Sequence, residues 1–372
     1  MQKHNAANER IKREYFAFLR EAMRHSEPTV DAVAKAIHLF EDHNKYKNFK
    51  AFHFEQAVAF KKKLAETRAI RSGERLSKST IYATLQALKR FFQWLAQQPG
   101  YKSRIQYPEA QYFNLSDKDT RVATARRERP VPTIQQINHV LCLMPTASEN
   151  EKRDRALIAF TLLTGARDAA IASMKLKHLD FLEGRVMQDA REVNTKSSKT
   201  FDTYFFPVGD EVLQIVLDWV EYLRTEKLWG NDDPLFPASK VALDANSQFA
   251  ANGLSREHWT TASPIREIFR VAFKRAGLPY FNPHSFRNTL VRLGQELCKS
   301  PEEYKAWSQN LGHEKVLTTF TSYGAVARTR QGEILRKLAQ SEDPSKTSPN
   351  AFAQEVANCL LRSGLVGSIQ EI

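Results

Sequence analysis

The chain has 372 residues, of which 42% are hydrophobic and 26% are charged. At roughly 150 residues per domain this length predicts about two domains, and the apolar content excludes a broadly disordered chain. The formal net charge is +13, and the segment up to Thr133 has 26 Lys and Arg against 14 Asp and Glu. Because nearly all of the excess lies in the first third, we expect that part to bind a polyanion, with DNA or RNA as the first candidate.

The sequence argues against a secreted, membrane or metal protein. The first residues, MQKHNAANERIKREYF, are charged and contain no apolar core of a secretory signal. The longest largely apolar stretch spans 11 residues, 156–166, whereas a membrane helix needs about 20. The three cysteines are far apart and no HExxH pattern occurs, so we expect neither a disulfide framework nor a zinc site. We therefore expect a cytoplasmic, nucleoid-associated protein without membrane partner, metal or cofactor.

Apolar residues at three- and four-residue spacing predict helices through the first third of the chain. The pattern covers residues 15–24, 29–40 and 52–66, and a polar loop over 67–78 follows it. Another helix then begins at Ser79 or Thr80. Its apolar face is formed by Ile81, Leu85, Leu88, Phe92 and Leu95.

The aromatic residues of this last helix have two interpretations. Phe91, Phe92 and Trp94 could stack on bases, but at helical spacing we expect them in the core of a bundle. Lys89 and Arg90 lie on the other side of the helix, where we expect them to contact DNA.

The run LSDKDTRVATARRERPVP, residues 115–132, predicts an extended interdomain linker, because it is polar and basic and ends in two prolines. Arg121, Arg126, Arg127 and Arg129 would let it follow a phosphate backbone. We therefore expect a helical DNA-binding domain over 1–115, a linker over 116–132, a catalytic domain over 133–340 and a C-terminal linker and helix over 341–372.

The second domain is predicted to be mainly helical with one small antiparallel sheet. A capped helix begins at Thr133, and another covers 151–163 and ends at Thr164 and Gly165. Residues 185–194 and 201–207 are predicted strands joined by the turn TKSSK. Further predicted helices include 209–227 and a detached helix over 351–362. The fold class is thus mainly α with a small β-sheet, an α+β domain after a helical bundle.

Four segments carry residues suited to chemistry at a phosphodiester. They are TGARDAAIASMKLKHLD with Arg167, TKSSKTFDTYFFP with Lys199, NPHSFRNTL with His284 and Arg287, and LGHEKVLTTFTSYG with His313 and Tyr323. Guanidinium groups bind phosphate oxygens in pairs and can neutralise the charge that develops at phosphorus without Mg²⁺. A tyrosine nucleophile needs a base, for which His284 is suited, and Lys199 could protonate the leaving 5′ oxygen.

These four segments, in this order after a basic helical domain, resemble the tyrosine recombinases of the phage integrase type. The resemblance implies a DNA strand-exchange enzyme that forms a covalent 3′-phosphotyrosine and needs neither metal nor ATP. It implies double-stranded DNA with paired inverted-repeat sites and a tetramer on DNA as partners, and it leaves open whether DNA-bending accessory factors take part. Carried over residue by residue, the catalytic set is Arg167, Lys199, His284, Arg287, His313 and Tyr323.

Two positions and two other functions stay open. Lys196 occupies the same turn as Lys199, and Ala170 stands where the family's TGxRxxE box often has an acid, with Asp168 adjacent. A type IB topoisomerase uses similar chemistry and would relax a plasmid that lacks any recombination site. A non-catalytic DNA-binding protein on the same scaffold is the other alternative, against which the complete residue set argues.

Overall fold

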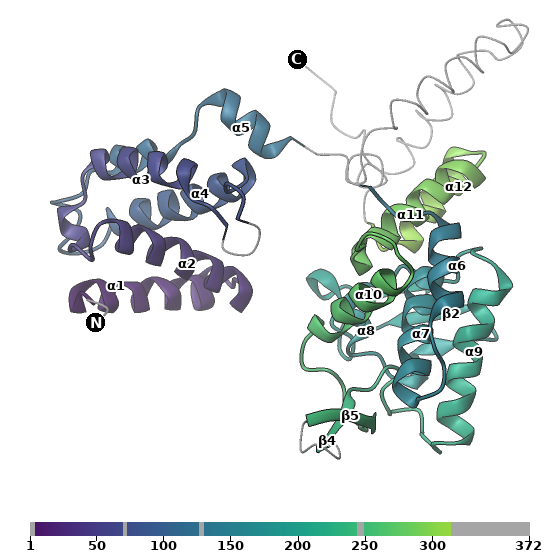
Figure 1. Ribbon diagram of the computed structural model, residues 1–372. Helices are drawn as coiled ribbons and strands as arrows, with labels where there is room; N and C mark the ends of the chain where they lie inside the picture. Colours follow the sequence, from purple (N-terminus) through teal and green to yellow (C-terminus); the bar gives the residue numbers. More distant parts are fainter. Residues whose placement is uncertain (1–3, 70–72, 126–129, 244–248, 314–372) are drawn as a thin grey trace, which may run out of the picture. The chain divides into compact units, whose positions relative to one another are not determined.

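A computed structural model describes residues 4–69, 73–125, 130–243 and 249–313. Internal contacts divide the chain into two compact units, Met1–Arg127 and Glu128–Ile372. Figure 1 shows a helical first unit and a second unit in which helices surround small sheets. The predicted fold class is confirmed. In the described part of the chain no helix is long and apolar enough to cross a membrane.

The first unit is a bundle organised around the apolar face of one helix, α4 (Lys78–Leu95). Its helices are α1 (Ala6–Ala17, continued by a π-helical turn over Phe18–Ala22), α2 (Glu27–His43), α3 (Phe54–Glu66), α4 and α5 (Asp117–Thr124). Short 3-10 helices cover Phe49–Ala51 and Tyr107–Phe113. The predicted helices therefore form. Their ends are displaced by at most three residues, except that the first helix begins at Ala6, nine residues before its predicted start.

Helix α4 carries the aromatic core of this unit. Phe91 and Phe92 are completely buried, and the Phe92 ring stacks on Phe52 with centroids 3.9 Å apart. Trp94 packs against Tyr15 of α1 at 4.9 Å. The prediction that these aromatics form a core is confirmed, which fits the strong preference of buried rings for tilted and offset contacts.

The prediction of an extended linker is wrong for part of the segment 115–132. Helix α5 begins there because the Ser116 side chain accepts a hydrogen bond from Asp119 N at 3.1 Å, which caps the first turn. An ion pair of 2.9 Å from Lys78 Nζ to Asp119 Oδ1 holds α5 against the start of α4. The polar composition thus reflects an exposed helix rather than extended backbone.

The second unit contains the remaining elements. Its helices are α6 (Ile134–Leu143), α7 (Glu149–Thr164), α8 (Asp168–Ile171), α9 (Asp210–Thr225), α10 (Ser263–Arg275), α11 (Pro283–Leu297) and α12 (Pro301–Asn310). Strands β1 (Leu179–Asp180), β2 (Arg185–Gln188) and β3 (Phe201–Tyr204) form an antiparallel sheet in that order. Strands β4 (Ser239–Leu243) and β5 (Phe249–Leu254) form a separate antiparallel pair.

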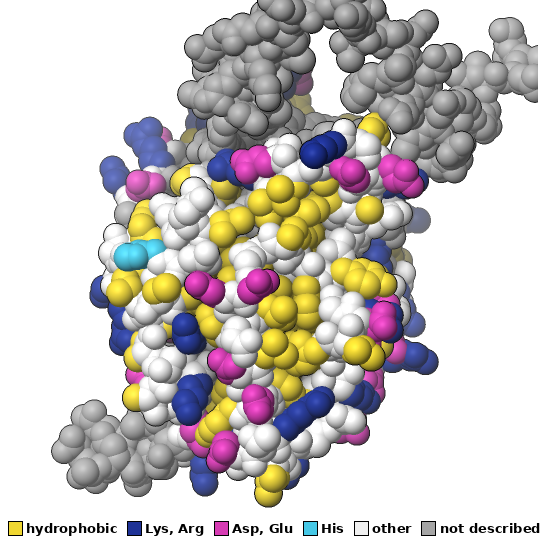
Figure 2. Space-filling view, turned by 90° about the vertical axis from the view of Figure 1, so that its right-hand side faces the viewer, with side chains coloured by type: hydrophobic (Ala, Val, Ile, Leu, Met, Phe, Trp, Pro, Cys, Tyr) yellow, Lys and Arg dark blue, Asp and Glu magenta, His cyan; other side chains and the backbone are white. Residues whose placement is uncertain are grey.

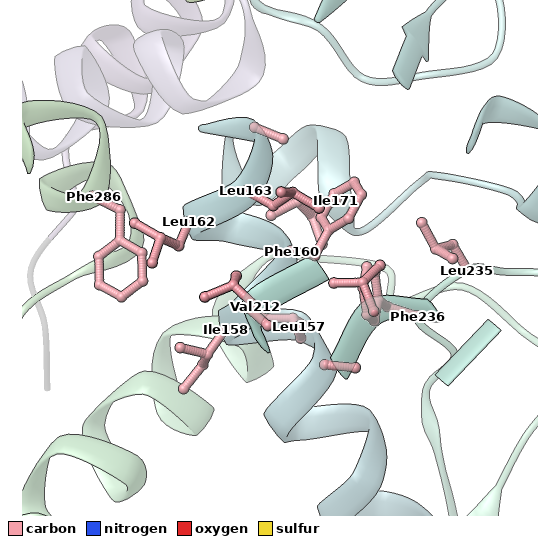
Figure 3. Packing of buried hydrophobic residues seen from close by; sticks show 14 of the residues in the cluster. Leu157, Ile158, Phe160, Leu162, Leu163, Ile171, Val212, Leu235, Phe236 and Phe286 are labelled. Atoms are coloured by element: carbon pink, nitrogen blue, oxygen red, sulfur yellow. The ribbon is translucent and has the colours of Figure 1, made fainter. Parts of the chain in front are cut away.

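Helix α7 is the central helix of the second unit. Every residue from Ala156 to Thr164 is buried, so this helix is apolar on all sides rather than amphipathic. Figure 3 shows its side chains, including Leu157 and Phe160, packed with Val212 of α9 and Phe286 of α11. The apolar stretch that is too short for a membrane helix is therefore the centre of the core.

The face of the molecule in Figure 2 has acidic and basic side chains interspersed around a band of apolar ones. Such mixed charge differs from the single-sign excess of the first third of the sequence. A polyanion would gain little electrostatic attraction on this face.

The two strands β2 and β3 are shorter than predicted. The main-chain N–H groups of Glu192 and Val193 both donate to the Asp189 carbonyl, which starts a turn directly after Gln188. Residues 189–200 therefore leave the ladder, and a 3-10 turn over Lys196–Ser198 lies within them. The lysines of this segment lie on a folded loop rather than on a plain hairpin tip.

Gly294 of α11 allows close contact with α12. A Cβ atom at this position would lie 2.6 Å from Trp307 Nε1, and that indole N–H is fixed by a hydrogen bond of 2.9 Å to Leu290 O. We predict that Gly294→Ala lowers the free energy of unfolding of the second unit by about 1 to 3 kcal/mol through overpacking. Urea unfolding followed by tryptophan fluorescence measures this.

Gly230→Ala serves as the control, because its added Cβ would have only Asp233 Oδ2 within 4 Å, at 3.9 Å. We expect this variant to stay within about 0.5 kcal/mol of the parent protein. Equal stability of Gly294→Ala and the parent would contradict the packing assignment.

Candidate active site

Arg287 is the centre of the candidate site. Helix α11 begins at Pro283 after the cap Asn282, so His284 lies in its first turn and Arg287 follows one turn later on the same face. The Arg287 side chain is buried, with 2% of the residue exposed. Its Nη1 donates to Gly165 O at 2.5 Å, and its Nη2 donates to Leu311 O and lies 3.1 Å from His313 Nε2. One guanidinium thus joins the end of α7, the start of α11 and the loop after α12.

Gly165 must be glycine for this contact. It ends α7 in the left-handed conformation, with φ of +59°. A Cβ there would lie 2.9 Å from Leu290 Cδ1 and 3.1 Å from Leu311 Cδ2. The turn aims its carbonyl at Arg287, and two residues later Arg167 caps α8 in extended conformation. The short spacing within the TGAR segment therefore brings Arg167 close to Arg287.

His313 is held in one neutral form. A guanidinium can only donate, so His313 Nε2 must accept from Arg287 and the ring proton lies on Nδ1. The pKa of His313 is lowered to about 3, first because the ring is buried and then because the charges of Arg287 and Arg167 lie nearby. The imidazole is consequently uncharged at neutral pH.

His284 is also kept neutral. Although the residue is exposed, partial desolvation of its ring lowers its pKa below the ordinary value, and the charges of Arg287 and Arg167 lower it further. Asp168 acts in the opposite direction. An uncharged imidazole at the edge of two guanidiniums is able to accept a proton.

Both lysines of the loop 189–200 lie on this side of the unit. Lys199 lines a cavity of about 670 Å³ together with Phe201, Asn310, Gly312 and His313. The charge of Lys196 contributes to the lowered pKa of both His284 and His313, which places it near the two rings. The structure therefore brings both candidates toward the histidines.

Asn310 is a functional position that sequence reasoning missed. Its Nδ2 donates to Tyr204 O at 2.8 Å and its Oδ1 accepts from Tyr204 N at 2.6 Å, so it extends the edge of β3. Gly312 also contacts β3, since a Cβ there would lie 2.7 Å from Phe201 Cζ. These contacts fix the loop that carries His313. In the sequence, the only feature that could have pointed to Asn310 is its polar amide side chain three residues before His313.

The acid absent at Ala170 has no direct replacement among the contacts described. Ala170 is buried in the apolar core, and Asp168 pairs with Arg266 of α10 at 2.8 Å. The main-chain carbonyls of Gly165 and Leu311 accept hydrogen bonds from the Arg287 guanidinium and orient it.

The structure thus brings Arg167, His284, Arg287 and His313 together, with Lys196 and Lys199 beside them. Tyr323 and the predicted helix over 351–362 lie outside the described residues. Among the predicted DNA contacts, Arg90 and Arg121 are exposed and Lys89 donates to Asn114 Oδ1 at 3.0 Å. Arg126, Arg127 and Arg129 also lie outside the described residues. Within the described ranges no group of three His, Cys, Asp or Glu could hold a metal ion.

Comparison with known proteins agrees with this geometry. The model of the phage integrase family matches residues 133–330, which is more than half of the chain. The chain belongs to the phage integrase family.

Curated relatives are tyrosine recombinases of low identity. The chain is 23% identical over 241 residues to tyrosine recombinase XerD of Staphylococcus saprophyticus, covering 64% of this chain and 71% of XerD. It is 23% identical over 259 residues to tyrosine recombinase XerC of Lactobacillus delbrueckii, covering 68% of this chain and 75% of XerC. Both matches extend well beyond a single motif.

Solved structures share the fold. A lambda integrase dimer bound to a COC′ core site aligns with TM-score 0.58 and 14% identity, over 85% of this chain and 95% of that one. XerH recombinase bound to a palindromic difH substrate aligns with TM-score 0.56 and 15% identity, over 89% of this chain and 84% of the XerH chain. At such identities the likeness concerns the fold alone.

The lowered pKa of His313 predicts a pH-dependent stability. Below the ordinary value of 6.5 the unfolded chain takes up a proton that the folded protein excludes, so stability is complete above about pH 6.5 and declines toward pH 3. His313→Gln keeps an acceptor for Arg287 but does not titrate. Between pH 7.5 and 5.0 we expect the parent to lose about 1 to 2 kcal/mol more than this variant. Urea unfolding at the two pH values measures it, and parallel losses would contradict the assignment.

Proposed function

We propose that this protein is a site-specific DNA recombinase that cuts and rejoins strands through a covalent 3′-phosphotyrosine link. The observation that supports this most is the buried Arg287, which is fixed beside Arg167 and two neutral histidines. Such a cluster suits a reaction in which negative charge develops on a phosphate and a proton leaves a hydroxyl. We further propose that Tyr323 supplies the hydroxyl.

In the cleavage step the Tyr323 oxygen forms a bond to phosphorus and the bond from phosphorus to the 5′ oxygen breaks. The tyrosine gives its proton to His284, whose lowered pKa keeps its ring ready to accept. A loop lysine, Lys199 or Lys196, gives a proton to the departing 5′ oxygen. Rejoining is the reverse, and the phosphotyrosyl bond conserves the energy of the original linkage.

The two arginines stabilise the transition state. Arg287 cannot lose its proton, and its contacts to Gly165 O and Leu311 O hold it in place before DNA arrives. Arg167 lies at the start of α8 beside it, and His313 is positioned by Arg287. Preorganised donors of this kind need no reorganisation as charge develops. On this mechanism cleavage proceeds in EDTA and without ATP.

We propose residues 1–115 as the DNA-binding domain and residues 133–340 as the catalytic domain. The charge excess up to Thr133 and the exposed Arg90 support the first assignment, and the exposed Arg121 supports DNA contact by the segment between the two domains. The relatives of known structure that hold a COC′ core site or a palindromic difH substrate support a duplex with paired inverted repeats as substrate. Exchange between two duplexes needs four active sites, so we propose a tetramer on DNA.

The nucleophile is tested by Tyr323→Phe. Removal of the hydroxyl abolishes attack on phosphorus but leaves the phosphate contacts, so we expect unchanged site binding and no covalent adduct. The measurement is a denaturing gel of protein mixed with labelled duplex, beside a binding assay. A normal adduct from this variant would reject Tyr323.

The role of Arg167 is tested by Arg167→Ala. Because its contact strengthens as charge develops, we expect cleavage to fall by about 100- to 1000-fold with a small change in affinity. Arg287→Ala should lose as much activity, but it also leaves two carbonyls without their donor and lowers stability, so Arg167 gives the cleaner result.

Arg90→Ala is the matched control for Arg167→Ala. As a proposed phosphate contact of the first unit it should weaken binding and reduce the salt dependence, with the cleavage rate of bound DNA unchanged. Affinity and rate falling in proportion in Arg167→Ala would mean that Arg167 is an ordinary backbone contact.

A further inference from the structure

The loop between β2 and β3 is folded back onto the second unit. Ala190 N donates to Thr200 Oγ1 at 3.1 Å, which closes the base of the loop. Within it, Val193 is buried in the core of the unit, and Asn194 N donates to Ser173 Oγ at 2.9 Å. Ser173 follows α8, the helix that Arg167 caps. The middle of the loop is therefore attached close to the first catalytic arginine.

A further attachment is the carboxylate of Glu192, which lies at the surface next to the buried Val193. Lys177 Nζ lies 2.8 Å from its Oε1, and His178 Nε2 lies 2.9 Å from its Oε2. His178 is buried, and its Nδ1 accepts from Lys175 N at 3.0 Å, so its Nε2 carries the proton and donates to Glu192. These contacts lower the pKa of Glu192 to about 2, with Lys177 as the largest cause. The carboxylate is thus ionised and held by two donors from the segment before β1.

These attachments act on Lys196 more than on Lys199. Lys196 is two positions after Asn194, which corresponds to at most about 7 Å of chain. Lys199 instead precedes Thr200, which closes the loop, and Phe201, which begins β3. The sheet therefore fixes Lys199, whereas Glu192 and Asn194 fix Lys196. The charge of Lys196 reaches both His284 and His313.

We propose that Glu192 is a positioning residue, which tethers the loop so that Lys196 rather than Lys199 protonates the leaving 5′ oxygen. This inference rests on the proposed recombinase function. The lysine ammonium gives its proton to the 5′ oxygen as the bond from phosphorus to that oxygen breaks. Glu192 touches neither DNA nor the reacting atoms and acts through the position of Lys196.

The chain offers a matched control in Asp232. Its carboxylate lies 2.9 Å from Lys177 Nζ and 3.3 Å from Lys175 Nζ, so it binds the same lysines as Glu192. Asp232 lies before β4 and makes no described contact with the loop 189–200. Asp232→Asn removes one negative charge from the network and leaves the tether of the loop in place.

The experiment compares cleavage of two duplexes that differ in one atom. The DNA sequence of both duplexes is selected from random oligonucleotides by covalent trapping on the parent protein. The first duplex has the normal bridging 5′ oxygen at the cut site, and in the second duplex sulfur replaces this oxygen. A thiolate leaves without protonation, so a defect in the general acid disappears on the sulfur substrate. Rates are measured at a protein concentration well above the Kd, so that all of the labelled duplex is bound. Thermal unfolding shows whether each variant is folded.

On the oxygen duplex we expect Lys196→Ala to be slower by about 100-fold, the lower end of what a positioned general acid contributes. Glu192→Gln keeps the lysine, so we expect a smaller loss of about tenfold. Both should come within about twofold of the parent on the sulfur duplex, since proton donation no longer limits the rate. Lys199→Ala should show no rescue by sulfur, so that any loss of rate is the same on the two duplexes. Asp232→Asn should cleave both duplexes like the parent, and Kd should not change.

Four results would overturn the inference. Glu192→Gln could be equally slow on both duplexes, which would mean a purely structural role for Glu192. It could instead be as fast as the parent on both duplexes, which would mean that Glu192 does not position the lysine. Lys199→Ala could show the sulfur rescue in place of Lys196→Ala. Asp232→Asn could match Glu192→Gln, which would assign the effect to network charge. If the parent protein traps no duplex at all, the proposed function fails first and this inference fails with it.

Discussion

The buried guanidinium of Arg287 is the interaction on which the rest of the site depends. A permanently charged group inside a protein is costly unless its donors find partners, and here Gly165 O, Leu311 O and His313 Nε2 accept from it. Those acceptors come from the turn before Arg167 and from the loop that carries His313. Satisfying one buried charge therefore fixes the positions of two other candidate catalytic residues.

The need to provide acceptors for Arg287 also determines the backbone conformation at nearby glycines. Gly165 places its carbonyl toward Arg287 only because a left-handed residue without a Cβ ends α7 against Leu290 and Leu311. Gly312 has φ of +68° and lies too close to Phe201 for any side chain. Asn310 then continues the edge of β3 through two hydrogen bonds with Tyr204. The same contacts therefore stabilise the second unit and determine the geometry of the site.

The sequence could predict what depends on local pattern. The capping residue Thr133 and the apolar face of α4 predict helices, and the four motifs predict Arg167, His284, Arg287 and His313 as site residues. The loop 189–200 could not be predicted, because its departure from the ladder depends on contacts of Glu192 and Asn194 with distant residues. Helix α5 was missed because a polar segment with a serine cap resembles a linker when its ion pair to Lys78 is unknown.

The charges that lower the pKa of the two histidines also couple DNA binding to proton transfer in the proposed mechanism. Without DNA, Arg287 and Arg167 disfavour a proton on His284 and His313. A bound phosphate brings negative charge to the same guanidiniums and offsets this repulsion, so the affinity of His284 for a proton rises as the substrate is seated. A base that is weak in the free protein thus becomes stronger when a tyrosine and a phosphate are both present. In the proposed mechanism the two arginines would in this way both stabilise the transition state and make the proton transfer depend on bound DNA.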